Sequence, residues 1–174
     1  SQAGGNVLVL EARRDNPGNY NCWYGRCEYT SSRMNTSGKR TFQYGRIEAR
    51  LKLPQTQGIW PAFWMLGNDI GTVGWPSCGE LDIMEHVGSN PGRVFGAVHT
   101  QVSAGPGTGA ARQVPDACSA LHDYQLHWTA DELAIGIDGV VYYRYPNPRA
   151  GRATWPFDAP QYLGRRMFAI KHHR

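Results

Sequence analysis

Three carboxylates that could act together, Glu80, Asp82 and Glu85, lie within six residues among large apolar side chains. On a β-strand the side chains alternate between faces, so Glu80 and Asp82 point one way while Leu81 and Ile83 point the other. Strict alternation would turn Glu85 into the core, where a carboxylate without a partner is costly. We therefore predict one extra residue, a β-bulge, that returns Glu85 to the face of the other two acids.

Three carboxyl groups on one face cannot all ionise easily, because each negative charge raises the pKa of its neighbours. Such a site provides one carboxylate that attacks and one carboxyl that stays protonated and donates, which is the pair that glycoside hydrolysis requires. A solvated strand face and a calcium or magnesium site are the alternatives. Aromatic residues upstream, in 61–66 and at Trp75, favour a sugar-binding cleft over a solvated face. Loops that bind hard cations usually carry Asp, Asn and Gly at turn spacing, unlike this apolar run.

The run 80–85 resembles the active-site strand of glycoside hydrolase family 16, in the bulged form typical of its laminarinases, the endo-1,3-β-glucanases. The resemblance extends through 44–50 (YGRIEAR) and 58–67 (GIWPAFWMLG), in the same order, and covers about residues 5–162. It implies an all-β fold, a concanavalin A-like jelly-roll β-sandwich of two curved antiparallel sheets with a groove across the concave sheet. A groove open at both ends would accommodate the middle of a polysaccharide, which implies endo attack on β-1,3-glucan.

The resemblance also implies the roles of the acids in a retaining, double-displacement mechanism. Glu80 would be the nucleophile that forms a glycosyl-enzyme intermediate. Glu85 would protonate the leaving oxygen and then activate water, while Asp82 between them would hydrogen-bond the nucleophile and tune both pKa values. This chemistry requires no cofactor. Some family members hold a structural calcium ion, but the segments that ligate it are not visible in this sequence.

Three tryptophans are candidates for contact with the sugar chain. Trp64 and Trp75 are predicted to stack on sugar rings, as matching tryptophans do in the family, although a large aromatic residue on a sheet is more often part of the core. Trp60 is a third candidate, for which a structural role is the commoner one.

Two basic side chains complete the predicted substrate-binding set. His99 matches a histidine near the sugar beside the cleaved bond, and a buried core histidine is its alternative. Arg46 is expected either to reach a sugar hydroxyl or merely to pair with Glu48 or Asp82.

Length and composition fit one all-β domain. A chain of 174 residues can bury a sizeable core, and we expect 1–174 to form a single catalytic domain. Its 21 glycines, 11 prolines, 6 Trp, 9 Tyr and 5 Phe, with few long helical patterns, favour β-structure. The net charge of +4 comes from mostly scattered basic residues, which does not fit nucleic-acid binding. The sequence has no run of 18 apolar residues, so we expect no membrane span. We also expect a monomer whose partner is the β-glucan substrate.

Four cysteines allow three pairings. Cys22 and Cys27 bracket a short turn, and a second bridge between Cys78 and Cys118 would brace the strand that carries Glu80. Two disulfides fit a secreted protein, whereas four buried thiols in a cytosolic protein are the alternative. The spacing is not that of a zinc site. Residues 1–5 carry no signal-peptide pattern, which a mature secreted chain would also lack.

The elements that must position these residues are predicted to be short strands. From Ile47 to Leu53 the odd-numbered residues share an apolar face and the even-numbered ones a polar face, which is typical of an antiparallel sheet with one wet side. A type I′ hairpin is predicted at Asp138-Gly139, and 101–116, rich in Gly, Ala and Pro, is predicted to be a long loop at the cleft rim. Other strands are expected at 7–12, 28–34, 60–65, 80–85, 94–100, 124–128, 133–137 and 140–145, which together predict a β-sandwich.

The family likeness fails after Tyr162. The family would continue with an apolar strand ending in glycines, whereas 163–174 (LGRRMFAIKHHR) is a basic, divergent tail. We expect this tail not to replace buried strands, so that the sandwich is incomplete and the chain is a fragment or altered reading of a longer enzyme. Three other functions stay open: a β-1,3(4)-glucanase, a transglycosylase on the same site, and a non-catalytic jelly roll that only binds sugar. A binding protein has no need for three charges so close together, which argues against the last.

Overall fold

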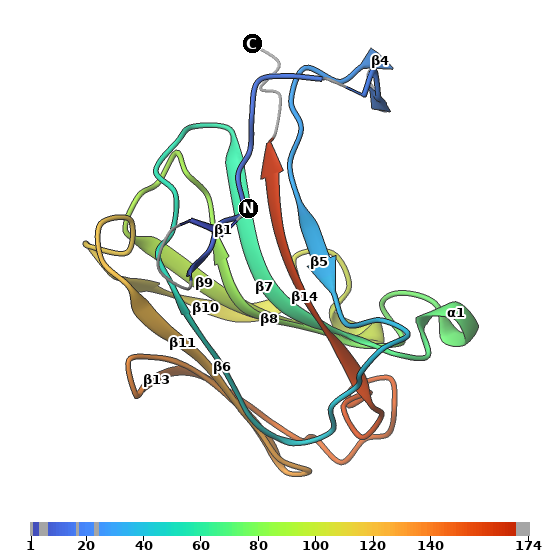
Figure 1. Cartoon of the computed structure of the whole chain (residues 1–174). Coiled ribbons are helices and arrows are strands. Elements are labelled where there is room, and N and C mark those ends of the chain that lie inside the picture. The colour runs from blue at the N-terminus through green and yellow to red at the C-terminus, as the bar shows by residue number, and fades with distance from the viewer. Residues whose placement is uncertain (1, 4–6, 17, 23–24, 170–174) are drawn as a thin grey trace.

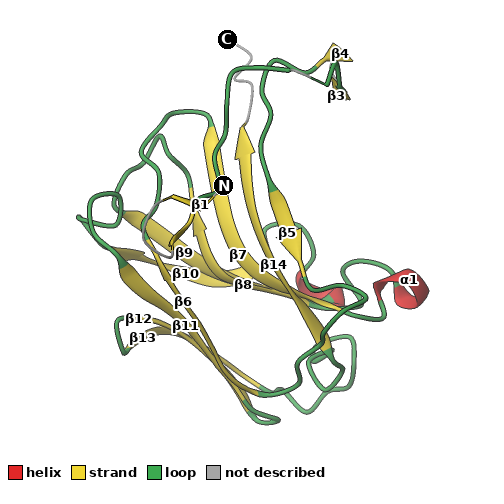
Figure 2. Ribbon diagram, viewed as in Figure 1, coloured by secondary structure: helices red, strands yellow, loops and turns green. Residues whose placement is uncertain are grey.

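The computed structural model describes residues 2–3, 7–16, 18–22 and 25–169, which form two large antiparallel sheets facing each other (Figure 1, Figure 2). The larger sheet has six strands in the order β10-β9-β8-β7-β14-β5, and the smaller has four in the order β13-β12-β11-β6. This architecture confirms the predicted all-β sandwich of antiparallel sheets. The elements are β1 (Gln2–Ala3), β2 (Val7–Leu8), β3 (Asn21–Cys22), β4 (Gly25–Arg26), β5 (Arg33–Asn35), β6 (Gly45–Leu51), β7 (Ile59–Gly67), α1 (Ile70–Val73), β8 (Glu80–His86), β9 (Arg93–His99), η1 (Gln101–Ser103), β10 (Thr108–Gln113), β11 (His122–Trp128), β12 (Glu132–Ile137), β13 (Val140–Pro146) and β14 (Gln161–Ala169).

The hydrophobic core lies between the two sheets, because each sheet turns one apolar face inward. On β6, Ile47, Ala49 and Leu51 pack on this core while the alternate residues are exposed, as the sequence pattern predicts. From the larger sheet, the core receives Phe63 and Met65 of β7 and the neighbouring apolar residues of β8. The opposite face of the larger sheet is therefore left for the polar residues of β8.

The connection between β12 and β13 is the tight turn at Asp138-Gly139. The φ angles are 52° at Asp138 and 78° at Gly139. Positive φ at both central residues is the type I′ geometry, whose twist matches that of the flanking strands. The predicted hairpin is confirmed.

The predicted rim loop at 101–116 contains an edge strand, which corrects that prediction. β10 pairs with β9 from Thr108↔Val98 to Gln113↔Arg93. Its sequence, TGAARQ, is poor in β-branched and aromatic residues and so gives little strand signal. The glycine explains the close pairing, since a Cβ at Gly109 would lie 2.1 Å from the carbonyl oxygen of Gly96.

Two predicted strands near the N-terminus are shorter in the structure. The expected strand at 7–12 is reduced to Val7–Leu8, which pairs with Gln2–Ala3. The expected strand at 28–34 is displaced to Arg33–Asn35, which pairs with β14.

Residues 163–169 of the basic tail belong to strand β14, which corrects the expectation that the tail would not take the place of a buried strand. β14 inserts between β7 and β5 and pairs with β7 from Gln161↔Gly67 to Ala169↔Ile59. Backbone hydrogen bonds on both sides hold this strand in place, so the ladder does not depend on apolar side chains. Residues 170–174 of the tail lie outside the described part of the chain.

One predicted disulfide is present and the other is not. Cys22 and Cys27 are bridged, with a Cα–Cα distance of 5.1 Å. The predicted Cys78–Cys118 bridge is wrong, because both residues are free thiols. Cys78 precedes β8, whereas Sγ of Cys118 lies 3.8 Å from Nε2 of His86, the last residue of that strand. The Cα atoms of bridged cysteines lie within about 7 Å, but a seven-residue strand spans about 20 Å.

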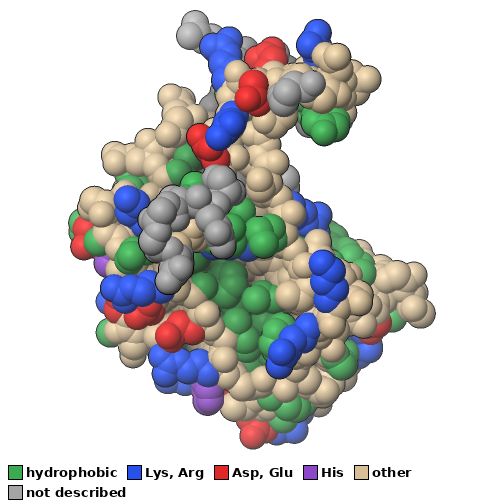
Figure 3. Space-filling model, in the orientation of Figure 1, with side chains coloured by type: hydrophobic (Ala, Val, Ile, Leu, Met, Phe, Trp, Pro, Cys, Tyr) green, Lys and Arg blue, Asp and Glu red, His purple; other side chains and the backbone are tan. Residues whose placement is uncertain are grey.

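The two sheets leave a hollow between the ends of β6, β7 and β14. A cavity of about 820 Å³ there is lined by apolar side chains, among them Leu51, Leu53 and Met84, together with Arg165. Figure 3 shows hydrophobic side chains in this hollow and Lys and Arg side chains around it. No described helix has the length and apolar character needed to cross a membrane.

Candidate active site

The acidic residues of β8 share one face because the strand carries a β-bulge. Asp82 pairs with Trp64 of β7, and Glu85 pairs with Ala62. Two residues separate the acids on β8, but only Phe63 separates their partners on β7. The ladder to β9 also shifts between Asp82 and Glu85. The two residues between them, Ile83 and Met84, both enter the core. The predicted bulge is confirmed, and it places Glu85 on the face of the other acids.

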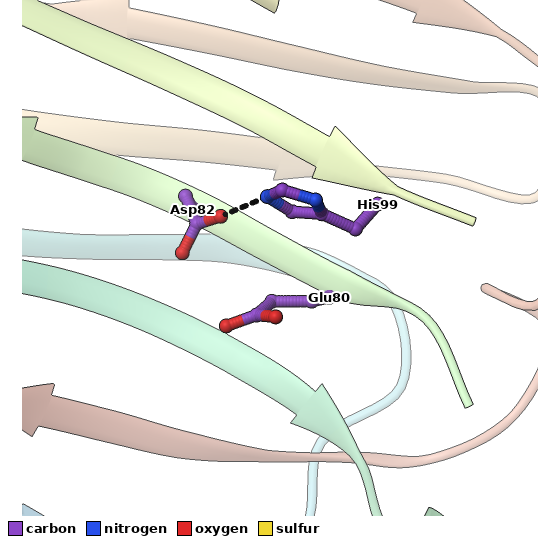
Figure 4. Close-up of side chains that lie close together, drawn as sticks. All are labelled: Glu80, Asp82 and His99. Atoms are coloured by element: carbon purple, nitrogen blue, oxygen red, sulfur yellow. Dashed lines mark ion pairs between the residues drawn. The ribbon is translucent and has the colours of Figure 1, made fainter. Parts of the chain in front are cut away.

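The three acids lie in a partly closed environment. Asp82 and Glu85 are 2% and 6% exposed, and Glu80 is half-buried. Figure 4 shows Glu80 and Asp82 on β8 beside His99 at the end of β9. Nε2 of His99 lies 3.0 Å from Oδ2 of Asp82, an ion pair when the imidazole is protonated. The other carboxylate oxygen of Asp82, Oδ1, is buried and has no hydrogen-bond partner among the described residues.

An indole N–H group holds the carboxyl group at each end of the acidic run. Trp75 donates from Nε1 to Oε2 of Glu80 at 2.7 Å. Trp60 donates from Nε1 to Oε1 of Glu85 at 2.9 Å. Both carboxyl groups are therefore oriented by a donor that cannot itself titrate.

The electrostatics of the site separate Glu85 from an ordinary surface glutamate. Burial, reinforced by the negative charge of Asp82, raises the pKa of Glu85 from 4.5 to about 8, against the opposing hydrogen bond from Trp60. Burial and the charge of Asp82 also raise the pKa of Glu80, which the hydrogen bond from Trp75 and the charge of His99 oppose. Near neutral pH the site therefore contains at least one protonated carboxyl group.

Two cations balance the acids. The hydrogen bond to Asp82 raises the pKa of His99, although burial opposes the shift. Arg166 of β14 lies in the field of all three acids, and burial lowers its pKa. An arginine stays protonated despite such a shift, so Arg166 contributes a positive charge beside the acids.

Glu80, Asp82 and His99 are also the group that could surround a metal ion within the described residues. One ligand atom from each lies within 4.8 Å of the others. In the structure these donors already have protein partners, because His99 pairs with Asp82 and the indole of Trp75 donates to Glu80. The arrangement fits proton chemistry between carboxyl groups.

Among the predicted substrate-binding residues, Trp60, Trp75 and His99 lie at the acids. The Trp75 ring is 47% exposed and lies 5.9 Å from the His99 ring, so one of its faces is open to a ligand. Trp60 is half-buried and bonded to Glu85.

Trp64 is placed differently from its predicted stacking role, and Arg46 takes one of its expected protein partners. Trp64 shares the face of the acids but is only 2% exposed, beneath the guanidinium of Arg33, so it offers no open ring for a sugar. Arg46 lies on β6 of the smaller sheet, where its side chain is exposed and donates to Glu48. The expected alternative of a pair with Glu48 is therefore confirmed. Contact with Asp82 or with a sugar at the acids is not formed, because Arg46 lies on the outer face of the other sheet.

Arg33 and Arg166 are site residues that the sequence analysis missed. Arg166 lies on β14, which borders β7, and Arg33 lies on β5, the next strand outward. Their register partners place both on the acid-bearing face. A signal was available, since alternation continued from Tyr162 would put Arg166 on the face of Tyr162. The basic composition of the tail concealed this period of two.

Comparison with known proteins identifies relatives with the same fold. Residues 2–169 match the family described as Glycosyl hydrolases family 16. The chain is 43% identical to a Beta-glucanase of Rhodothermus marinus over 94% of its own length and 58% of that protein. The laminarinase of Flavobacterium sp. UMI-01 superposes with a TM-score of 0.84 at 40% identity, over 94% of this chain and 67% of that one. SCLam, a non-specific endo-beta-1,3(4)-glucanase, superposes with a TM-score of 0.83 at 38% identity, over 92% of this chain and 60% of that one. The chain thus spans between about half and two thirds of the length of these proteins.

Proposed function

The chain belongs to glycosyl hydrolases family 16, and from this premise we propose that it is an endo-acting hydrolase of β-1,3-glucan with a retaining, double-displacement mechanism. The observation that carries the proposal is the difference between the two ends of the acidic run. Glu85 is buried and keeps a proton up to a pH of about 8. The pKa of Glu80 is also raised, but Glu80 is only half-buried, so its charged form is less disfavoured. One acid and one nucleophile are what a retaining glycosidase requires.

In the first step the carboxylate of Glu80 attacks the anomeric carbon and the Glu85 carboxyl gives its proton to the leaving glycosidic oxygen. The bond from C1 to that oxygen breaks as the bond from C1 to Glu80 forms. In the second step the Glu85 carboxylate takes a proton from water, which attacks C1 and releases Glu80. Each half-reaction returns Glu85 to the state that the other needs.

Asp82 sets the balance between the two states of Glu85. Its charge raises the pKa of both glutamates, so it favours the protonated form of Glu85, whose proton the first step consumes. His99 and Arg166 oppose that effect and limit the cost of a second negative charge after the proton has left.

The substrate proposal rests on the relatives and on the open face of Trp75. The named relatives include a laminarinase and an endo-beta-1,3(4)-glucanase, so β-1,3-glucan is the substrate that they have in common. Trp75 offers an exposed indole next to Glu80, where a sugar ring could stack. Trp60 is assigned to holding Glu85 rather than to stacking.

We further propose that the chain acts as one catalytic domain, as a monomer and outside the cell. The Cys22–Cys27 bridge supports export, because disulfides persist in oxidising compartments. The chemistry above needs no partner chain, since one chain supplies both glutamates.

The test is the release of reducing ends from laminarin, with curdlan and mixed-linkage β-glucan in parallel. Glu80→Gln and Glu85→Gln should each abolish release, while Glu48→Gln on the smaller sheet should retain it. Proton NMR of the first product should show retention, and added acceptor sugars would reveal a transglycosylase. Binding of laminarin without any release of reducing ends would favour a sugar-binding jelly roll and overturn the proposal.

A further inference from the structure

A row of side chains crosses the larger sheet from Glu85 toward its edge. Glu85 of β8 pairs with Ala62 of β7, Ala62 pairs with Arg166 of β14, and Arg166 pairs with Arg33 of β5. Register partners in antiparallel strands point to the same face, so both arginines extend from the face that carries the acids. The side chain between them and Glu85 is a small alanine.

The two guanidinium groups lie over one indole. Cζ of Arg33 is 4.9 Å and Cζ of Arg166 is 5.9 Å from the centroid of the Trp64 ring. Beneath the ring is Gly164 of β14, where a Cβ would lie 2.4 Å from the ring atoms, so the indole rests on bare backbone. The Tyr162 ring packs edge-on against the indole, with centroids 5.9 Å apart. The indole is therefore fixed from several sides and holds the arginines by cation–π attraction.

Two like charges directly opposite each other on neighbouring strands destabilise a sheet. Arg166 gains from the acids beside it, but Arg33 is exposed on the edge strand and one strand further from Glu85. Neutralising the acids explains Arg166, whereas Arg33 is held next to it by the Trp64 ring and by a hydrogen bond with Tyr162. A pair of guanidinium groups on an ordered aromatic base is suited to an anionic group, which can accept hydrogen bonds from both.

We propose that Arg33 and Arg166, held on Trp64, form a subsite for an anionic substituent, a carboxylate or a sulfate, on a sugar near the cleavage site. The subsite presupposes the glycan hydrolase proposed above and adds a substrate class to it. With strands about 4.8 Å apart, Arg166 lies about 10 Å from Glu85 along the row and Arg33 about 14 Å. A polysaccharide that crosses the sheet over the acids would bring a sugar close to the reacting one onto the arginines.

The experiment measures binding without turnover. All chains carry Glu80→Gln, and calorimetry gives the Kd of a laminari-oligosaccharide in three forms: neutral, carboxymethylated and sulfated. We expect the anionic forms to bind about tenfold more tightly than the neutral form, the gain of a charged hydrogen bond, with the advantage falling as salt rises. Whichever anionic form shows the larger advantage identifies the substituent.

Variants separate this subsite from general attraction to a basic protein. Arg33→Gln should remove most of the anionic advantage. Arg144→Gln, an exposed arginine that pairs with Glu132 on the smaller sheet, is the matched control and should keep it. An equal loss in both variants means non-specific attraction and overturns the subsite. Equal affinity of the starting chain, which carries Glu80→Gln alone, for all three forms of the oligosaccharide would also overturn the subsite.

The outcomes also distinguish this subsite from the proposed function. If the neutral oligosaccharide binds and laminarin is hydrolysed but the anionic forms have no advantage, the subsite alone is wrong. If an anionic form binds through Arg33 while laminarin is not hydrolysed, the subsite stands and the β-1,3-glucanase proposal fails. If no form binds, both are wrong.

Discussion

The indole N–H of Trp60 reaches across from β7 and donates to Oε1 of Glu85 at 2.9 Å. The carbonyl oxygen of a neutral carboxyl group is the better acceptor, so this hydrogen bond favours the proton of neutral Glu85 on Oε2. Trp60 thereby selects which oxygen can face a leaving group. It is a positioning residue, since it acts on the reaction through Glu85.

Trp60→Phe should test this relationship, because it keeps the ring and removes only the donor. The hydrogen bond from Trp60 lowers the pKa of Glu85, so its loss should move the basic limb of the kcat/KM profile, near pH 8, to higher pH. The loss of orientation should lower kcat about tenfold, which is part of the roughly 10²–10⁴-fold that general acid–base catalysis contributes. Rates on laminarin between pH 4 and 10 measure both effects.

Trp155→Phe is the matched control, since Trp155 also donates from Nε1 to a carboxylate, Oδ1 of Asp158, at 3.0 Å. Trp155→Phe should leave the basic limb of the kcat/KM profile at the same pH. An unshifted limb in Trp60→Phe would show that Glu85 is held by other contacts.

The stability of the protein should fall as pH rises from about 4.5 to about 8. Glu85 binds its proton more tightly in the folded chain than in the unfolded one, because its folded pKa is raised to about 8. Its contribution is therefore complete below 4.5 and is lost as the pH rises toward 8, by at most about 1.4 kcal/mol per pH unit. The raised pKa of His99 acts in the same direction.

Urea unfolding at intervals of one pH unit measures this slope. Glu85→Gln should flatten it, while Glu132→Gln on the smaller sheet should not. A wild-type stability that is constant across the range would refute the raised pKa.

The stereochemistry of azide products should separate the roles of the two glutamates. In Glu80→Ala with an aryl β-glycoside, azide can occupy the space of the lost carboxylate and attack C1 from that side, giving the inverted glycosyl azide. In Glu85→Ala the glycosyl-enzyme still forms on Glu80, and azide replaces water on the other side, giving the retained product. NMR of the anomeric proton distinguishes the two. The opposite pair of products would exchange the assigned roles.

The bulge of β8 could be predicted because its cause is local. A carboxylate at position 85 would be buried without a partner in a regular strand, and the sequence itself contains that conflict. The hairpin at Asp138-Gly139 was predictable for the same reason, since the turn residues determine the φ angles.

The misplaced residues all depend on pairing between distant segments. Arg46 has the alternation of a strand, but no local pattern indicates which sheet that strand joins. The role of Arg166 depends on β14 entering the sheet between β7 and β5. Its backbone pairs with strands about 100 and 130 residues earlier, and its side chains give no apolar signal of that pairing. The Cys78–Cys118 pairing failed because spacing in sequence does not reveal that one strand separates the two thiols.

Cys78 and Cys118 should both titrate as free thiols. In denaturant without reductant, a thiol reagent should report two thiols per chain, because Cys22 and Cys27 remain bridged. In the native protein Cys78 should react slowly, since it is fully buried and burial raises its pKa. Finding no free thiol after rapid denaturation would show that Cys78 and Cys118 form a second disulfide after all.

Gly164→Ala should loosen the support of Trp64 and lower the stability. The added methyl group would lie 2.4 Å from the Trp64 ring, too close for any contact, so the indole or β14 must move. Trp64 has little room to move, because it is buried beneath Arg33 and against Tyr162. Overpacking of this kind costs about 1–3 kcal/mol, which urea unfolding would resolve. Gly71→Ala is the control, because a Cβ there meets no atom within 4 Å and its stability should be unchanged or slightly higher. Equal stability of the two variants would show that the indole does not rest on the backbone of β14.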